Sequence, residues 1–245
     1  IIFKFKVKLM TTRSRPSNAL RPIKFSSGIN KNAFSSVLVE FGDTKVLTCV
    51  SYEGKVPPFL RNTGSGWLTA EYAMLPAATS SRTRREVTLG KPSGRTSEIQ
   101  RLIGRSLRAA IDLKQLGELT LTIDCDVLVA DGGTRTASIS GAYVALEIAI
   151  KKLIKMGVLK TSPIQRQITA ISIGLSNNGL LLDLDYADDS SADVDLNIVM
   201  DQNLNLIEIQ GTAEKNVFTT DQLMQMLALA SEGIKDIASK QRDFI

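Results

Sequence analysis

The sequence predicts a single α+β domain with mixed sheets and three main helices. Three observations predict this class. Short β-rich runs come in pairs separated by turn residues, and three segments carry apolar residues at helical spacing. No low-complexity linker or repeat of fixed period divides the 245 residues. A composition that is 43% hydrophobic and 22% charged is typical of an ordinary globular protein.

The strands are predicted from alternating side chains and from the turn residues between them. The expected hairpins pair residues 35–41 with 44–52, 168–175 with 180–184, and 195–200 with 206–210. Residues 119–129 alternate cleanly and predict one further strand. The segment 54–94 is rich in Gly, Pro, Ser and Thr, and we expect it to be mostly loop.

Three helices are predicted from apolar residues on one face. The first begins near Thr96 or Ser97, the second follows Arg135 and ends before Gly157, and the third begins at Thr219. Thr219 and Gln222 have the spacing of a capping box. The expected core faces are Ile99, Leu102, Ile103, Leu107, Ala110 and Ile111 in the first; Ala142, Leu146, Ile150 and Leu153 in the second; and Leu223, Leu227, Ala230, Ile234 and Ile237 in the third.

The chain contains no histidine, which excludes Ser-His-Asp and Cys-His catalysis and every histidine-dependent zinc site. Chemistry must then come from carboxylates, hydroxyls, Lys, Arg or a metal bound through oxygen. The two cysteines, Cys49 and Cys125, are far apart and form no CxxC motif, which favours free thiols and a reducing, cytoplasmic compartment. Cys125 lies in an alternating apolar run, so we expect a buried thiol.

Charge and hydropathy limit the partners. The net charge of +5 and the pI near 9.2 permit nucleic acid as a partner without requiring it. Only 5% of residues are aromatic, which argues against a base-stacking platform. No apolar stretch is long enough to span a membrane, so we expect no membrane partner. Residues 1–9 alternate apolar residues with lysine and do not resemble a secretory signal; we expect translation to begin at Met10 and the domain to span 10–245.

The first cluster that could bind a ligand is Gly132-Gly133-Thr134-Arg135, between a predicted strand and a helix. Glycines let the backbone approach an anion, and the free N–H groups at a helix start favour negative charge. Thr134 adds a hydroxyl donor, and Arg135 can hold a phosphate through two parallel bonds. The alternative is a tight strand-to-helix turn without a ligand, because the spacing matches neither a Walker A loop nor a dinucleotide fingerprint.

The second cluster is basic and lies between residues 82 and 108. Its cationic members, set against Glu86 and Glu98 alone, are Arg82, Arg84, Arg85, Lys91, Arg95, Arg101, Arg105 and Arg108. Such a stretch suggests a track for a phosphate backbone, and the alternative is a solvated helix face after a charged loop. An N-terminal arm that contains Arg13, Arg15, Arg21 and Lys24 without an acidic residue could extend the track.

The third cluster is acidic and spans thirteen positions. Its members are Asp183, Asp185, Asp188, Asp189, Asp193 and Asp195. Crowded carboxylates stay ionised most easily around a divalent cation, while the alternative is a solvated acidic loop. We expect Asp183 and Asp185 to end a strand on one face, and Asp189 and Asp195 to bracket the loop that follows. A basic track for RNA, an anion pocket and a metal site are the features that an enzyme of phosphoryl transfer combines.

Three strings of residues resemble the bacterial ribonuclease PH family. They are residues 66–72 (GWLTAEY) with 74–76 (MLP), residues 94–96 (GRT) with 98–105 (EIQRLIGR), and residues 124–128 (DCDVL) with 130–138 (ADGGTRTAS). The likeness runs from Met10 to the C-terminus. It implies a β-α-β-α fold, a ring-shaped homohexamer made as a trimer of dimers, and phosphorolytic 3′-to-5′ trimming of tRNA precursors that releases nucleoside diphosphates.

The resemblance also implies roles for particular residues. Phosphate, the co-substrate, would be held by Arg95, Gly133, Thr134 and Arg135. The catalytic carboxylates, which would bind Mg²⁺ or Mn²⁺, would be Asp189 and Asp195. RNA would contact Arg82 and Arg85 near a subunit interface, and the helical Arg101 and Arg105 would extend the RNA track.

Two positions depart from the family pattern. Ala77 stands where the family usually has Arg, and Val129 where it usually has Gln, which affects the RNA track but neither the phosphate nor the metal residues. Two alternatives stay open: a catalytically silent RNA-binding subunit of an exosome-like ring, and a structural protein associated with ribosomes. Retention of Arg95, Arg135, Asp189 and Asp195 argues for the enzyme.

Overall fold

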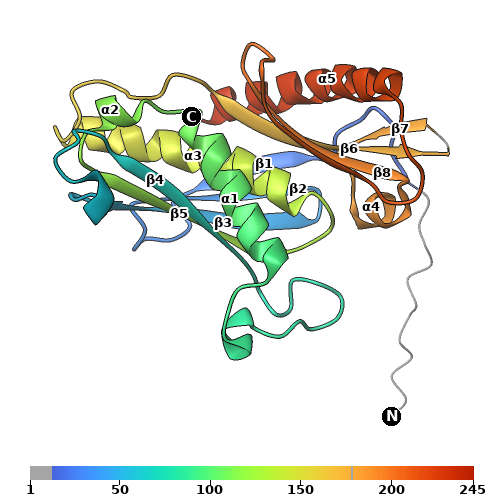
Figure 1. Cartoon of the computed structure of the whole chain (residues 1–245), viewed down its shortest axis with the longest axis horizontal. Helices are drawn as coiled ribbons and strands as arrows, with labels where there is room; N and C mark the ends of the chain where they lie inside the picture. The colour runs from blue at the N-terminus through green and yellow to red at the C-terminus, as the bar shows by residue number, and fades with distance from the viewer. Residues whose placement is uncertain (1–12, 178) are drawn as a thin grey trace.

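The structure, a computed structural model, describes residues 13–177 and 179–245. The expected leader over residues 1–9 and the expected start at Met10 lie outside these residues. Two β-sheets and three long helices form four layers: one helix, the second sheet, a pair of helices, and the first sheet (Figure 1). The α+β prediction with three main helices is confirmed.

The first sheet has five strands in the order β1-β2-β3-β5-β4. Its strands are β1 (Ile23–Ser27), β2 (Ser35–Phe41), β3 (Thr44–Glu53), β4 (Trp67–Met74) and β5 (Thr120–Val129). The sheet is mixed, because β4 runs parallel to β5 while the other neighbours are antiparallel. The predicted hairpin joins β2 to β3 with Phe41 opposite Thr44, and Gly42 has the positive φ of +57° that a two-residue hairpin turn requires.

The second sheet has four antiparallel strands in the order β7-β6-β8-β9. Its strands are β6 (Ile168–Ser176), β7 (Gly179–Leu182), β8 (Val194–Asp201) and β9 (Leu206–Ala213). Both predicted hairpins of the C-terminal half are confirmed as β6–β7 and β8–β9. The central strands β6 and β8 are buried on both faces, as expected of strands that are covered by helices on each side, whereas β9 is largely exposed.

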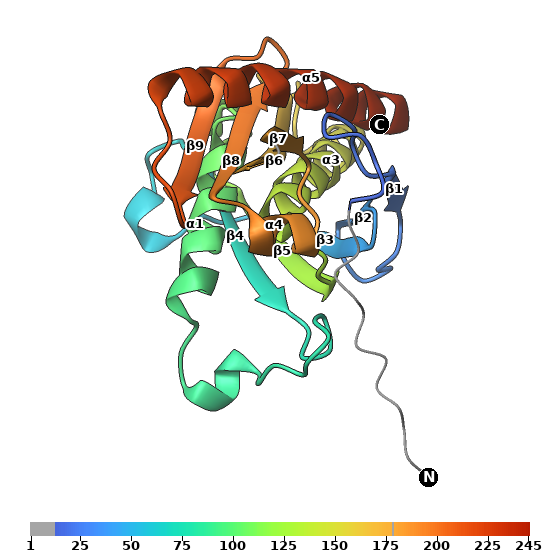
Figure 2. The ribbon, with the colours of Figure 1, turned by 90° about the vertical axis from the view of Figure 1, so that its right-hand side faces the viewer.

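The helices fill the space between and above the sheets. They are α1 (Gly94–Arg108), α2 (Leu113–Leu116), α3 (Thr134–Lys155), α4 (Tyr186–Ser191) and α5 (Thr220–Phe244), with single 3-10 turns η1 (Pro58–Leu60) and η2 (Glu86–Leu89). α3 packs on the first sheet with one side and on β6 with the other, and α1 lies beside it on β4. α5 covers the other face of the second sheet (Figures 1 and 2). None of the helices in the described ranges is long and apolar enough to cross a membrane.

The structure differs from the sequence prediction at several places. The expected loop over residues 54–94 contains β4, whose buried Leu68, Ala70 and Tyr72 alternate as in any half-buried strand. β1 and the short α2 and α4 were not predicted. α1 begins at Gly94 because the side chain of Ser93 accepts a hydrogen bond from the Thr96 N–H and caps the helix.

The buried core matches the predicted helix faces closely. All residues predicted for the first and second helices are buried, as are Ala230, Ile234 and Ile237 of α5. Leu223 and Leu227 near the start of α5 are only half-buried, although both pack against the core. Both cysteines are free and buried, and burial raises the pKa of the Cys125 thiol strongly, so it stays protonated.

Candidate functional site

The turn between β5 and α3 presents backbone N–H groups at a helix start. Gly132 and Gly133 both have positive φ angles, +75° and +63°, and α3 begins at Thr134 without a side-chain cap. A Cβ at Gly132 would lie 2.5 Å from the carbonyl carbon of Asp185, so only glycine lets this turn pack against the segment before α4. The uncapped N–H groups of α3 are the groups that bind anions at helix starts.

Thr134 is held by a buried tyrosine. Its hydroxyl lies 2.9 Å from the hydroxyl of Tyr72, which projects from β4. When Tyr72 donates in this pair, the proton of Thr134 is available to an anion that occupies the turn. Burial raises the pKa of Tyr72, which keeps the phenol protonated and able to donate.

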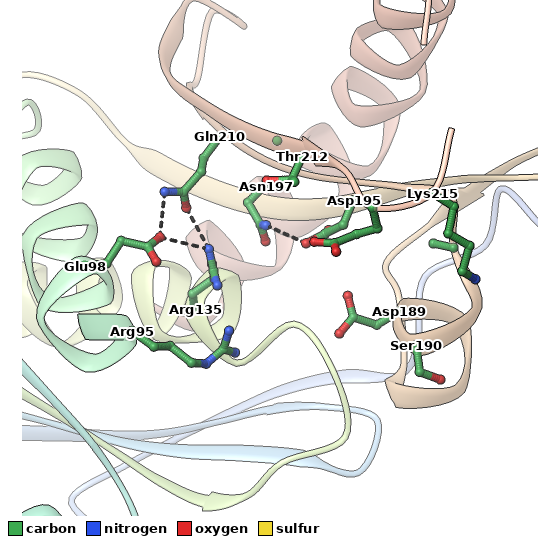
Figure 3. Close-up of a pocket in the computed structure, with 13 residues that line it drawn as sticks. Arg95, Glu98, Arg135, Asp189, Ser190, Asp195, Asn197, Gln210, Thr212 and Lys215 are labelled. Atoms are coloured by element: carbon green, nitrogen blue, oxygen red, sulfur yellow. Dashed lines mark hydrogen bonds and ion pairs between the residues drawn. The ribbon is translucent and has the colours of Figure 1, made fainter. Parts of the chain in front are cut away.

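Two arginines stand at the starts of two helices. Arg95 lies in the first turn of α1, and its side chain makes no hydrogen bond or ion pair to any residue in the described ranges, while Arg135 lies in the first turn of α3. Nη1 of Arg135 donates to Oε1 of Gln210 at 2.7 Å and to Oε1 of Glu98 at 3.2 Å. Figure 3 shows Arg95 and Arg135 side by side at one wall of the site.

Two carboxylates lie at the opposite wall. Asp189 comes from α4 and is exposed to the cavity, and Asp195 is the second residue of β8 and is half-buried (Figure 3). Burial raises the pKa of Asp195 to about 6, and the charge of Asp189 adds to the shift. The protein walls around the cavity also raise the pKa of Asp189, although Arg95 and Arg135 oppose this.

Such a pair of carboxylates suits a hard divalent cation. The pKa of each carboxyl is raised above its usual value, and within residues 13–177 and 179–245 the amide of Asn197 is the one side-chain donor to Asp195, at 3.3 Å. Among residues 13–177 and 179–245, no group of three or more metal-ligating side chains converges. The donor set therefore fits Mg²⁺, which is usually bound by one or two carboxylates together with water and substrate oxygens.

The four charged residues line one continuous cleft. A cavity of about 600 Å³ extends between α1, α4, β8 and β9, and a second of about 320 Å³ adjoins it at the turn before α3. Both are lined by Arg95, Arg135, Asp189, Asp195 and Asn197. The geometry thus joins an anion-binding turn, two cationic side chains and a carboxylate pair in one space.

Comparison with known proteins identifies the architecture around this cleft. The family model of the 3′ exoribonuclease family (RNase PH), domain 1, matches residues 19–152, and the model of its domain 2 matches residues 167–233. The chain belongs to the 3′ exoribonuclease family. The boundary between the two models falls between α3 and β6, so the turn before α3 comes from domain 1 and the carboxylates come from domain 2.

Solved structures of low sequence identity share the fold of this family. A chain of the Archaeoglobus fulgidus exosome with RNA bound to the active site has a TM-score of 0.79 at 20% identity, covering 92% of this chain and 90% of that one. Rice (Oryza sativa) Rrp46 has a TM-score of 0.76 at 18% identity, covering 94% and 97%. A chain of an archaeal exosome core has a TM-score of 0.73 at 18% identity, covering 93% and 89%.

The three arginines of the N-terminal arm are paired with carboxylates and are not free to extend an RNA track, as the sequence suggested they could. Arg21 forms a buried pair with Asp183, Arg13 binds Asp188 at 2.5 Å, and Arg15 binds both Asp185 and Asp188. These guanidinium groups face inward and neutralise three of the six clustered carboxylates. Lys24 alone keeps an exposed side chain, 4.0 Å from Glu40.

The acidic cluster is divided between structural and cavity-lining residues. Asp183 follows the end of β7 with a left-handed φ of +57°, so it does not share a strand face with Asp185 as predicted. Asp185 instead caps α4 by accepting a hydrogen bond from the Asp188 N–H. Only Asp189 and Asp195 of this cluster line the cavities.

The predicted RNA-binding arginines lie outside the cavities. Arg82 and Arg85 are exposed in the long connection between β4 and α1, and Arg101 is exposed on α1. Arg105, also on α1, pairs with Glu208 of β9. These positions leave the RNA roles of all four residues as predictions.

Sequence reasoning missed several cavity residues. Glu98, Asn197, Gln210, Glu214 and Lys215 all line the larger cavity. Gln210 and Asn197 occupy ordinary strand positions, and nothing in their local sequence distinguishes them from surface residues. Only the pairing of β8 with β9, which places Gln210 opposite Asn197, brings them to the cleft.

Proposed function

We propose that this protein is a phosphorolytic 3′-to-5′ exoribonuclease, a nucleotidyltransferase that trims tRNA precursors and other RNA 3′ ends with inorganic phosphate. The observation that supports this most is the convergence of Arg95, Arg135, Asp189 and Asp195 on one cleft of a family fold. An anion pocket beside a carboxylate pair that can bind a cation suits a reaction in which inorganic phosphate attacks a phosphodiester.

In the proposed reaction, an oxygen of hydrogen phosphate forms a bond to the phosphorus of the 3′-terminal phosphodiester. The bond from that phosphorus to the 3′ oxygen of the preceding nucleotide breaks, and the proton of hydrogen phosphate ends on that 3′ oxygen. The products are a nucleoside 5′-diphosphate and an RNA shorter by one nucleotide. The nucleophile arrives already charged, so the absence of histidine is compatible with this chemistry.

The chain's own residues would bind and orient the reactants. Arg95, Arg135, the hydroxyl of Thr134 and the N–H groups at Gly133 would hold the attacking phosphate in line with the RNA end. Asp189 and Asp195 would hold Mg²⁺, or Mn²⁺, which when bound offsets negative charge that develops on the reacting oxygens. Arg82, Arg85, Arg101 and Arg105 would contact the RNA backbone further from the reaction.

A second candidate function is a non-catalytic RNA-binding subunit of an exosome-like ring. It is supported by two of the solved structures that share the fold, which are chains of archaeal exosomes. In either case we propose a ring assembly, and a homohexamer built as a trimer of dimers for the enzyme. Phosphorolysis separates the two candidates, because only the enzyme consumes phosphate.

The experiment is incubation of the full chain with a 3′-extended tRNA and Mg²⁺, with and without inorganic phosphate. We expect nucleoside diphosphates only when phosphate is present. An Asp189→Asn substitution should lower the rate by about a hundredfold or more, the scale of removing a group that stabilises transition-state charge. Asp193→Asn is the matched control, since Asp193 belongs to the same acidic run but does not line the cavities.

Three outcomes contradict the proposal. Nucleoside monophosphates formed without phosphate would indicate hydrolysis. RNA binding by a correctly assembled ring without any turnover would support the non-catalytic subunit. Near-full activity of Asp189→Asn, with the folded state and native mass verified by light scattering, would remove the metal assignment.

A further inference from the structure

Arg135 is held on one edge by two side chains to which the sequence assigned no role. Its Nη1 donates to Gln210 Oε1 at 2.7 Å and to Glu98 Oε1 at 3.2 Å. Gln210 Nε2 also donates to the same Glu98 oxygen at 2.6 Å, which closes a three-membered ring of hydrogen bonds. Figure 3 shows Glu98, Gln210 and Arg135 together on the side of the site away from Asp189.

The ring joins three separate elements. Glu98 comes from α1, Arg135 from the first turn of α3, and Gln210 from β9. Arg135 is well buried, with 14% of its side-chain surface exposed, whereas Glu98 keeps 43%. A long arginine side chain has many rotamers in isolation, and the two hydrogen bonds of the guanidinium, to acceptors that are themselves joined, restrict it to one of them.

The bonding pattern leaves one edge of the guanidinium for a ligand. Every side-chain hydrogen bond of Arg135 to residues 13–177 and 179–245 uses Nη1. The remaining donors, Nε and Nη2, belong to a side chain that lines both cavities next to Arg95. Arginine holds a phosphate best through two parallel N–H bonds from one edge, so a fixed opposite edge favours that geometry.

We propose that Glu98 and Gln210 are positioning residues, which fix the guanidinium of Arg135 so that its free edge receives inorganic phosphate. This inference rests on the proposed function, and it assigns the specificity of the phosphate site to a contact between α1 and β9. Neither residue touches phosphate itself. Their effect is on the fraction of molecules in which Arg135 is ready to bind.

Glu98 could instead compete with phosphate for Arg135, and this role predicts the opposite change in phosphate binding. If the carboxylate competed with phosphate for Arg135, its removal would strengthen phosphate binding. If it positions Arg135, truncation weakens binding, while a neutral side chain of the same shape retains an acceptor and preserves the site. Glu98→Ala and Glu98→Gln therefore distinguish positioning from competition.

The test measures the phosphate dependence of phosphorolysis by the full chain. We expect Gln210→Ala and Glu98→Ala to raise the KM for phosphate about tenfold, the effect of one lost charge-assisted hydrogen bond. The change in kcat should be about threefold or less, because the chemical groups remain. Glu98→Gln should stay within about twofold of the wild-type KM, which is rescue by the conservative variant.

The chain offers a matched control between the same two elements. Arg105 of α1 and Glu208 of β9 form an ion pair, so Glu208→Ala removes a contact between α1 and β9 without touching Arg135. If the Glu98 and Gln210 variants acted only by loosening α1 from β9, Glu208→Ala would raise the KM for phosphate equally. We expect it to leave that KM unchanged.

A second measurement separates this inference from the proposed function. Thermal unfolding of the full chain is followed with inorganic phosphate or with chloride at equal ionic strength, and it requires no catalysis. We expect phosphate to raise the Tm of the wild type and of Glu98→Gln, and to raise that of Gln210→Ala much less. A wild type that gains stability from phosphate but does not cleave RNA would contradict the proposed function alone.

The inference is overturned by any of three results. These are an equal rise in Tm in wild type and Gln210→Ala, a lower KM for phosphate in Glu98→Ala, or an absence of phosphate stabilisation in the wild type.

Discussion

At the scale of single residues, Asp124 carries a charge that the fold makes unfavourable. It lies on β5, and burial raises its pKa, with further increases from the charges of Glu71 and Asp126. Because the folded pKa is above the unfolded one, the folded state binds the proton more tightly. The ionised carboxylate therefore costs stability above the folded pKa, and this cost disappears as the pH falls through it.

An Asp124→Asn substitution should raise the Tm at pH 8 by about 1–2 °C, since Asn carries no charge to repel its neighbours. The gain should shrink as the pH falls toward 4, where the wild-type carboxyl becomes protonated. Differential scanning calorimetry at both pH values measures the two Tm differences. A difference that is the same at pH 8 and pH 4 would show that charge is not its cause.

The residues of the site could be predicted from sequence only where a local string carries the chemistry. Gly133, Thr134 and Arg135 are contiguous at a strand-to-helix turn, and the structure places them beside the cavity. Arg21 shows the opposite case, because its partner Asp183 is 162 positions away and the sequence shows only that one is basic and the other acidic. The sign of a side chain's charge is local, whereas its burial and its partner depend on the tertiary fold.

At the scale of elements, ion pairs from the N-terminal arm, residues 13–21, stabilise α4 in its position. α4 has six residues and is too short to be stable alone. Arg15 reaches it through Asp185 at 3.0 Å and Asp188 at 3.3 Å, and Arg13 binds Asp188 as well. Since α4 carries Asp189, the arm sets the position of one wall of the cleft.

An Arg15→Ala substitution should weaken Mg²⁺ binding about tenfold, because partners of the groups that hold a ligand typically have effects of this size. The measurement is the Mg²⁺ concentration that gives half of the maximal rise in Tm, which requires no catalysis. Lys24→Ala is the matched control, since Lys24 is a nearby basic residue in β1 whose side chain is 72% exposed and 4.0 Å from its partner. Equal Mg²⁺ binding by Arg15→Ala and wild type would mean that α4 is held by other contacts.

Helices and hairpins were predicted well because their causes are local. Thr219 caps the start of α5, and the predicted capping box is present in full. β4 was missed because its alternating Leu68, Ala70 and Tyr72 lie inside a long polar segment and pair in parallel with β5, a strand some fifty positions later. A parallel pair has no adjoining turn that marks it, so only the sheet itself reveals the strand.

At the scale of the whole molecule, α3 joins the parts matched by the two family models. Gly141 approaches Val39 of the first sheet so closely that a Cβ would lie 2.4 Å from its side chain. The neighbouring Ser140 bonds to the backbone of Ala170 in the second sheet. One continuous set of buried residues extends from Phe25 in β1 to Ile237 in α5. A helix that is buried from both sides gives the two sheets a common core.

This shared core predicts that the two sheets unfold together. Trp67, the single tryptophan, lies in β4 of the first sheet, where it packs against Arg108 and Phe59. Its fluorescence therefore reports the first sheet, while far-UV circular dichroism reports all elements. In urea at fixed protein concentration, we expect both signals to give one midpoint, as a cooperative transition requires.

A substitution in the second sheet gives a stricter test of whether the two sheets unfold together. Ile171 in β6 is fully buried, and Ile171→Ala should cost about 2–5 kcal/mol of unfolding free energy through lost burial and a cavity. If the sheets share one core, this change lowers the urea midpoint seen by Trp67 as much as the midpoint seen by circular dichroism. If each half unfolds by itself, the Trp67 midpoint stays at its wild-type value while the circular dichroism splits into two steps. In that case the second sheet, which carries Asp195, would unfold and the cleft would be lost while the first sheet stayed folded. The result therefore also decides whether the residues proposed to bind phosphate and metal belong to one cooperative unit.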